Sequence, residues 1–159
     1  MRFFTDEKCE TGVAHAEYEK YWHEHRDLLT DDLLRINGGM LPERCFPDHR
    51  AAIYLHDARI KEFLRDSQDV RILLYGDHFG DLRIIRMHYS GVVECEGVTS
   101  ANLSNNMYSD LMCHETTIDK DGVFNHQMLF ASGDILMIRF RLFAVEVSDD
   151  EKPLYDSRR

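Results

Sequence analysis

Hydrophobic and polar residues follow two different spacings along this chain. Between residues 13 and 39, apolar and aromatic side chains recur every three to four positions, the spacing of one helix face. These side chains are Tyr18, Trp22, His25, Leu29, Leu33 and Ile36. Thr30 precedes two aspartates and is a typical N-cap, so a second short helix is predicted to begin there. Gly38 and Gly39 are predicted to end the helical part, because glycine tolerates the left-handed conformation of a helix C-terminus.

From about Ala52 onward the spacing changes to the alternation of β-strands. Strands are predicted at residues 54–61, 70–75, 82–89, 92–98, 123–131 and 135–147, whereas residues 108–116 fit either a strand or a short helix. In the first strand His56 is predicted to face inward, with Asp57 facing out or into a turn. The last strand changes its apolar phase between Phe140 and Phe143, which predicts a β-bulge.

The order of the elements predicts an α+β fold. Short turns make consecutive strands antiparallel neighbours. We therefore expect an N-terminal helix packed on one face of an antiparallel, mostly meander β-sheet of about five to seven strands. Residues 1–148 are predicted to form a single domain, residues 40–51 and 99–106 to be loops, and residues 149–159 to be a charged C-terminal tail.

Composition narrows the classes of partner. The chain has 159 residues, 43% of them hydrophobic, which suffices for one domain with its own core. Its 29 acidic and 19 basic residues give a net charge of -10. An acidic protein is poorly suited to nucleic acid or to an anionic membrane, so we expect neither as a partner. A basic protein partner is compatible with this charge.

Targeting and cysteine patterns favour a cytoplasmic protein. Acidic residues at positions 6, 7 and 10 stand where a signal peptide needs a basic start and an apolar stretch. No apolar run approaches the ~20 residues of a membrane span. The four cysteines form no Cys-x-x-Cys pair, which argues against a zinc or redox motif. Nucleotide-binding and metal-ligand motifs are absent as well, so we expect no metal and no cofactor.

His56 and Asp57 are the first candidate for a polar site. An adjacent imidazole and carboxylate can serve a metal-dependent hydrolase, and other strand histidines could join them. However, neighbouring residues on a strand point to opposite faces, so the two converge only where the strand is interrupted. A half-buried histidine beside a hydrogen-bonded aspartate is the simpler structural interpretation.

A second candidate is an acidic stretch over residues 94–121. It holds six acidic residues and one lysine, a net charge of -5: Glu94, Glu96, Asp110, Glu115, Asp119 and Asp121. One interpretation is a solvated edge of the sheet. The functional interpretation is an anionic face that binds a basic partner.

Several segments resemble a family of small bacterial proteins without an assigned function. The resemblance rests on the start Met1-Arg2-Phe3-Phe4-Thr5, the early aromatic-rich helix, the segment Leu55-His56-Asp57-Ala58, and the closing strands at residues 124–130 and 135–147. Similar small acidic proteins include immunity proteins, which neutralise the toxins of rival cells. The resemblance implies an immunity-like role and supplies no catalytic residues.

The sequence therefore predicts a cytoplasmic, non-enzymatic binding protein that occludes a basic partner. A metal-dependent hydrolase that uses His56 and Asp57 is one alternative. A structural or oligomerisation module that pairs sheet edges is another.

Overall fold

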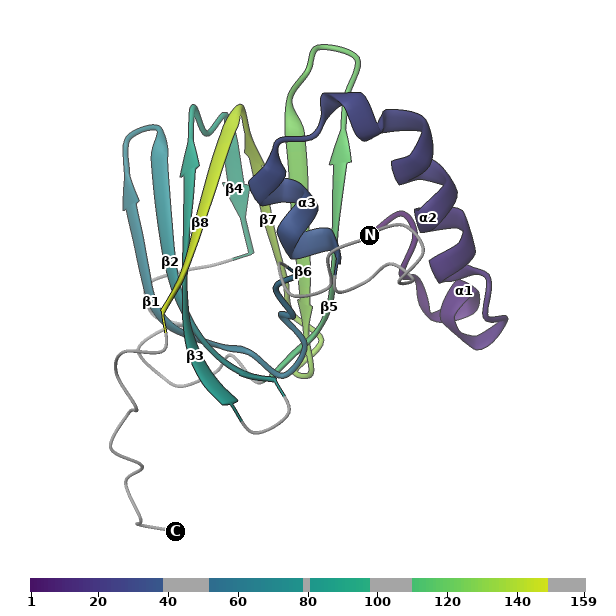
Figure 1. Cartoon of the computed structure of the whole chain (residues 1–159), viewed down its shortest axis with the longest axis horizontal. Helices are drawn as coiled ribbons and strands as arrows, with labels where there is room; N and C mark the ends of the chain where they lie inside the picture. Colours follow the sequence, from purple (N-terminus) through teal and green to yellow (C-terminus); the bar gives the residue numbers. More distant parts are fainter. Residues whose placement is uncertain (39–51, 79–80, 98–109, 149–159) are drawn as a thin grey trace, which may run out of the picture.

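The helices lie together at the N-terminal end of the chain (Figure 1). The computed structural model describes residues 1–38, 52–78, 81–97 and 110–148. The helices are α1 (Asp6–Glu10), α2 (Ala14–His25), the 3₁₀ turn η1 (Arg26–Leu28) and α3 (Asp31–Gly38). The predicted second helix is confirmed, because Thr30 Oγ1 accepts a hydrogen bond from Leu33 N (3.3 Å) at the start of α3. The described segments contain no helix long and apolar enough to cross a membrane.

Two antiparallel sheets make up the rest of the described chain. Its eight strands are β1 (Arg59–Asp66), β2 (Asp69–His78), β3 (Asp81–Ser90), β4 (Glu94–Glu96), β5 (Leu111–Ile118), β6 (Phe124–Phe130), β7 (Ile135–Phe140) and β8 (Leu142–Ser148). Sheet A has the order β1-β2-β3-β8, and sheet B has the order β4-β7-β6-β5. The predicted α+β class is confirmed, and the ambiguous segment around residue 111 is a strand. The expectation of one meander sheet is replaced by a two-sheet sandwich.

The chain passes between the sheets at two neighbouring points. β3 continues into β4 at Gly91, and β7 continues into β8 at Arg141, whose N–H donates to Ser90 O (3.1 Å). Gly91 has φ +63°, and a Cβ there would lie 3.2 Å from the Arg141 Cβ, so glycine suits this crossing. The predicted phase change after Phe140 is real. Its cause is the passage from sheet B to sheet A rather than a bulge within one strand.

The main core lies between the sheets. In most strands alternate residues point inward, including Ile72 and Leu74 of β2, Met87 of β3, and Leu136 and Ile138 of β7, all at most 1% exposed. Side chains of α3 join this core as well, with Leu33 and Ile36 fully buried.

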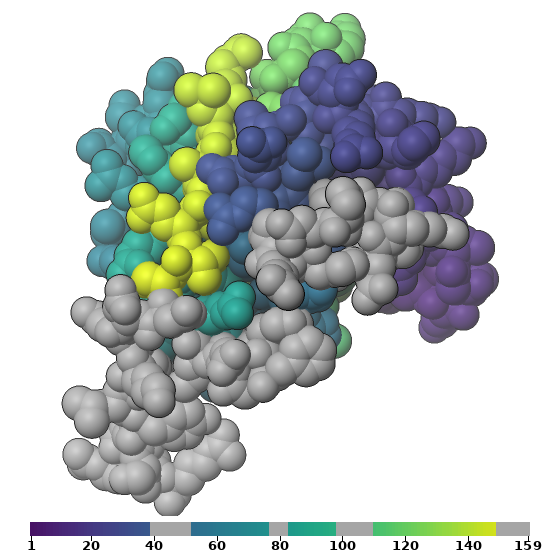
Figure 2. All heavy atoms as spheres, viewed as in Figure 1, coloured from purple at the N-terminus to yellow at the C-terminus, as the bar shows by residue number. Residues whose placement is uncertain are grey.

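The sequence predicted a helix packed on one sheet face. In the structure the helices cover sheet edges instead. α3 lies beside β8 (Figure 2), where Asp32 Oδ2 accepts from Val145 N (3.2 Å) and Arg35 Nη1 donates to Val145 O (3.4 Å). On the other side of α3, Asn37 Nδ2 donates to Thr116 Oγ1 of β5 (3.3 Å). Since β8 and β5 are edge strands of different sheets, α3 closes one side of the sandwich.

The segment around His56 is not the strand that the alternation predicted. His56 and Asp57 form a turn in which Asp57 has φ +63°, and β1 begins only at Arg59. The turn bends the chain toward β5, where Asp57 N donates to Leu111 O (2.8 Å) and Leu111 N donates to Ala58 O (2.9 Å). The His56 side chain is 59% exposed, so its predicted inward orientation is wrong. The prediction that Asp57 lies in a turn is confirmed.

Other predictions have mixed outcomes. The sequence Asp119-Lys120-Asp121-Gly122 favours a hairpin turn, because Asp and Gly accept positive backbone angles. This prediction is confirmed, since the turn joins β5 to β6 and Gly122 N donates to Asp119 O (3.1 Å). The predicted loops at 40–51 and 99–106 and the predicted tail at 149–159 fall outside the described residues.

Candidate binding groove

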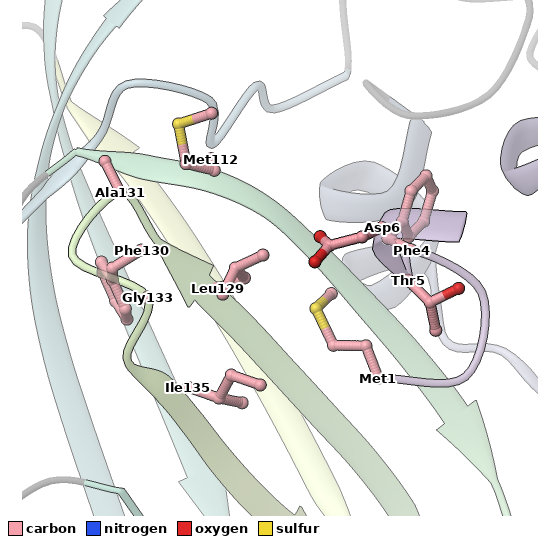
Figure 3. A pocket seen from close by; sticks show the side chains of 10 residues that line it. All are labelled: Met1, Phe4, Thr5, Asp6, Met112, Leu129, Phe130, Ala131, Gly133 and Ile135. Carbon is pink, nitrogen blue, oxygen red and sulfur yellow. The ribbon is translucent and has the colours of Figure 1, made fainter. Parts of the chain in front are cut away.

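An open groove lies between the N-terminal segment and the outer face of sheet B (Figure 3). Its volume is about 520 Å³. One wall is formed by Met1, Phe4, Thr5 and Asp6, and the rest by Met112, Leu129, Phe130, Ala131, Gly133 and Ile135. Most of these side chains are apolar, so the groove offers a hydrophobic floor that faces solvent.

The N-terminal wall is held in place by a buried carboxylate. Glu115 of β5 is 2% exposed and accepts hydrogen bonds from the backbone N–H groups of Arg2, Phe3 (2.8 Å) and Phe4 (3.2 Å). Phe4 also packs edge-on against Tyr18 of α2, with ring centroids 5.2 Å apart. The groove therefore has a fixed wall.

Strand register and a bulge supply the floor. Leu129 of β6 lies opposite Ile135 of β7 on one side and Cys113 of β5 on the other. Met112 is the extra residue where the β5 register shifts between Leu111 and Cys113. Such a bulge re-aims a side chain, and Met112 is accordingly 46% exposed at the rim, while Ile135 is 40% exposed. These exposed apolar side chains lie together around the groove.

Acidic residues lie on two sides of this apolar floor. Of the lining residues in the described part of the chain, Asp6 is the one with a charged side chain. Along the chain, Asp134 lies between the lining residues Gly133 and Ile135. On the far side Glu96 of β4 is exposed and lies opposite Met137 in the register of β7. The groove is thus apolar in its centre and acidic at its border.

The six acidic residues singled out by sequence do not form one continuous face. Glu94 and Asp119 both pair with Arg139, at 3.1 and 2.8 Å, and these contacts raise the pKa of Arg139. Asp110 pairs with Arg59, whose hydrogen bond lowers the pKa of Asp110. Asp121, like Glu96, is exposed.

Glu115 is the exception in that set. An exposed position was expected for it, and that expectation is wrong, because the N-terminal segment buries its carboxylate. A binding role for the other five residues stays a prediction.

His56 and Asp57 form an exposed pair. Their Nδ1 and Oδ1 atoms are 3.0 Å apart, and both side chains are more than half exposed. The described residues contain no group of three or more His, Cys, Asp or Glu side chains placed to hold a metal ion. A site role for the pair stays a prediction.

The sequence analysis missed a buried polar chain between the sheets. Tyr89 Oη lies 2.8 Å from His126 Nδ1, and His126 Nε2 lies 3.2 Å from His114 Nδ1. All three residues are at most 1% exposed. Burial lowers the pKa of His114 to about 4 and that of His126 well below its usual value, so both rings are neutral near pH 7.

A signal for this histidine pair was present in the sequence. The turn at residues 119–122 sets the register of the β5–β6 hairpin, which places Thr116 opposite His126. His114 is then a diagonal neighbour of His126 on the same face of the hairpin.

His88 lies apart from that pair, on the outer face of sheet A. Its Nε2 is 3.1 Å from Asp69 Oδ1 and 3.3 Å from Ser90 Oγ, and Ser90 Oγ donates to the same Asp69 oxygen (2.7 Å). In a catalytic triad the carboxylate binds the other imidazole nitrogen, on the side away from the serine. Here one nitrogen faces both groups, so the contacts describe a local hydrogen-bond network rather than an activated serine.

Neither models of known protein families nor curated protein sequences match this chain. The resemblance to small bacterial proteins therefore gains no support from these comparisons, and an immunity-like role stays a prediction.

Proposed function

We propose that the protein is a non-enzymatic binding protein that holds an apolar segment of a basic protein partner in the groove. The observation that carries the proposal is the apolar floor of Met112, Leu129 and Ile135, with Asp6 among the residues that line the groove. Exposed apolar surface of this kind marks interaction sites on soluble proteins.

The charges around the groove support a basic partner. Asp6 on one side and Glu96 on the other carry acidic side chains, and no lysine or arginine is found among the described residues that line the groove. With a net charge of -10 for the whole chain, the approach of a basic protein is favoured and the approach of a second copy is opposed.

The shape of the groove supports a protein segment over a small molecule. Small-molecule sites enclose most of the ligand surface and present several convergent polar groups. This groove is open along the face of sheet B, and within the described segments Thr5 and Asp6 are the polar side chains that line it. An open apolar surface suits a few anchoring side chains of a larger partner.

Selection from a random peptide library tests the proposal. Peptides selected on the wild-type protein should combine apolar anchors with lysine or arginine. Their affinity should fall at least about tenfold when Met112 and Ile135 are both changed to glutamate, because the charged side chains remove the apolar floor. Association should also slow as salt rises, because salt screens the attraction.

The matched control places the same substitutions on the other sheet. Leu64 of β1 and Leu142 of β8 are 50% and 65% exposed, so Leu64→Glu with Leu142→Glu should leave peptide affinity unchanged. Selected peptides that are acidic, or that bind the Met112→Glu/Ile135→Glu variant as well as the wild type, would contradict the proposal.

A further inference from the structure

We infer that the segment held in the groove is an amphipathic α-helix with basic residues on both sides of its apolar stripe. This inference rests on the proposed function and names the kind of segment that the groove accepts. It follows from the hydrogen-bonding groups that the groove floor and the neighbouring edge strand β5 offer to the backbone of a partner.

Among the described residues, the side chains on the floor of the groove offer no hydrogen-bond partners to a peptide backbone. The floor is made of side chains that stand on the face of sheet B, chiefly Leu129, Ile135 and Met112. An extended peptide on such a floor would leave N–H and C=O groups facing apolar atoms, which is unfavourable. A helix satisfies these groups internally and presents only side chains.

The nearby edge strand is closed to an added strand over much of its described length. At one end of β5, Leu111 pairs with Asp57 and Ala58. Farther along, Thr116 N donates to Tyr18 Oη and Ile118 N donates to Tyr21 Oη, both at 2.7 Å. A partner strand therefore cannot extend sheet B at these positions. A partner in the groove contacts the protein through its side chains.

The lining side chains suit the apolar stripe of a helix. Met1 and Met112 are flexible and adapt to irregular surfaces, as in proteins that bind helical targets through methionine-rich grooves. The protein's own helix α2 already packs along the β5 edge of the same sheet through its aromatic side chains.

The positions of the acidic groups define the flanks of the helix. Asp6 stands on the N-terminal wall, and Glu96 stands beyond β7 on the opposite side. A helix with lysine or arginine on both sides of its apolar stripe would contact both carboxylates simultaneously. A helix with its basic residues on one flank only would meet one of them.

Two 14-residue peptides of identical leucine and lysine composition test the inference. In the first, leucines recur with helical spacing; in the second, they alternate with lysine as in a strand. The helical peptide should bind at least tenfold more tightly and gain helical circular dichroism on binding. Both effects should disappear with the Met112→Glu/Ile135→Glu variant and persist with the Leu64→Glu/Leu142→Glu variant.

The flanking charges are tested with the same helical peptide. Asp6→Asn and Glu96→Gln should each weaken its binding severalfold, whereas Glu146→Gln, on the exposed outer face of sheet A, should not. Equal loss for Glu146→Gln would show that only net charge matters and would overturn the two-sided arrangement.

The remaining outcomes separate the inference from the proposed function. If the alternating peptide binds the groove as tightly as the helical one, the helix inference is wrong and the binding function stands. If the Met112→Glu/Ile135→Glu substitutions change the binding of neither peptide, the helix inference and the proposed binding function are both wrong. A wild-type dimer that becomes monomeric in this variant, measured by sedimentation, would identify a second copy as the occupant and overturn the inference.

Discussion

The carboxylate of Glu115 ties the N-terminal segment to the sheet. It accepts hydrogen bonds from three consecutive backbone N–H groups, those of Arg2, Phe3 and Phe4. The segment it holds carries Met1 and Asp6, which line the groove. A single acidic side chain therefore affects both the stability of the fold and the shape of the candidate site.

We predict that Glu115→Ala lowers the free energy of unfolding by roughly 3 kcal/mol, because buried N–H groups lose their acceptor and each costs about 1–3 kcal/mol. Urea unfolding measures this difference. Glu96→Ala is the control, since an exposed carboxylate contributes within about 0.5 kcal/mol. Equal unfolding curves for both variants would contradict the role assigned to Glu115.

The sequence could not distinguish Glu115 from the other acidic residues of its stretch. Acidic side chains are mostly exposed, so an exposed position was the reasonable expectation. The groups that bury Glu115 lie more than 110 positions away along the chain. No local pattern reports a contact of that separation.

Helix α2 protects the free edge of β5 with tyrosine hydroxyls. Tyr18 Oη accepts from Thr116 N (2.7 Å) and donates to Asn37 Oδ1 (2.6 Å), and Tyr21 Oη accepts from Ile118 N (2.7 Å). Unpaired edge groups invite pairing with other chains. Side chains of α2 and α3 therefore supply hydrogen-bond partners within the chain for backbone groups of the edge strands β5 and β8.

We predict that Tyr18→Phe destabilises the protein by about 2–3 kcal/mol, because two buried polar groups lose a partner while the ring stays in place. Hydrogen exchange of the Thr116 amide should become faster. Tyr75→Phe is the matched control, since Tyr75 lies half-buried on the outer face of sheet A. Unchanged exchange at Thr116 would show that the hydroxyl does not protect the edge.

Helices and strands were largely predictable, whereas their assembly was not. Alternation identified most strands, and Thr30 marked the start of α3 correctly. The error at His56 arose because a turn with Asp57 at positive φ interrupts an apparently regular alternation. That turn exists because residues 57 and 58 pair with Leu111, a contact outside any local window.

The sandwich as a unit encloses two neutral histidines. His114 and His126 lie between the sheets together with Tyr89, whose pKa burial raises well above its usual value. The lowered histidine pKa values mean that the folded protein resists protonation where the unfolded chain accepts it.

We predict that stability falls as the pH falls from 6.5 toward 4. Well above pH 6.5, the usual histidine pKa, both histidines are neutral in the folded and the unfolded state, so their full contribution is present. Below it the unfolded state binds more protons, and each histidine lowers the free energy of unfolding by up to about 1.4 kcal/mol per pH unit. Urea unfolding at pH 7.5, 6 and 5 measures the slope.

Other groups act in a different pH range. The pKa values of Asp69, Asp110 and Asp119 are lowered from 3.8, so their contribution is lost only in more acidic solution. His114→Gln should reduce the slope between pH 5 and 6.5 by about half, whatever its stability at pH 7.5. A flat profile for the wild type over this range would contradict the assignment of neutral, buried histidines.

Local spacing in the amino-acid sequence was enough to establish the α+β class, the pair of N-terminal helices, most strands and the β5–β6 turn, because each depends on residues a few positions apart. The division into two sheets, the burial of Glu115 and the histidine pair depended on the folded chain. So did the groove, which joins Met1 to residues 112–135. Alternation shows which residues share a strand face, but it does not show which strands become neighbours. That choice follows from burying many apolar side chains at once, and it is a property of the packed core as a unit.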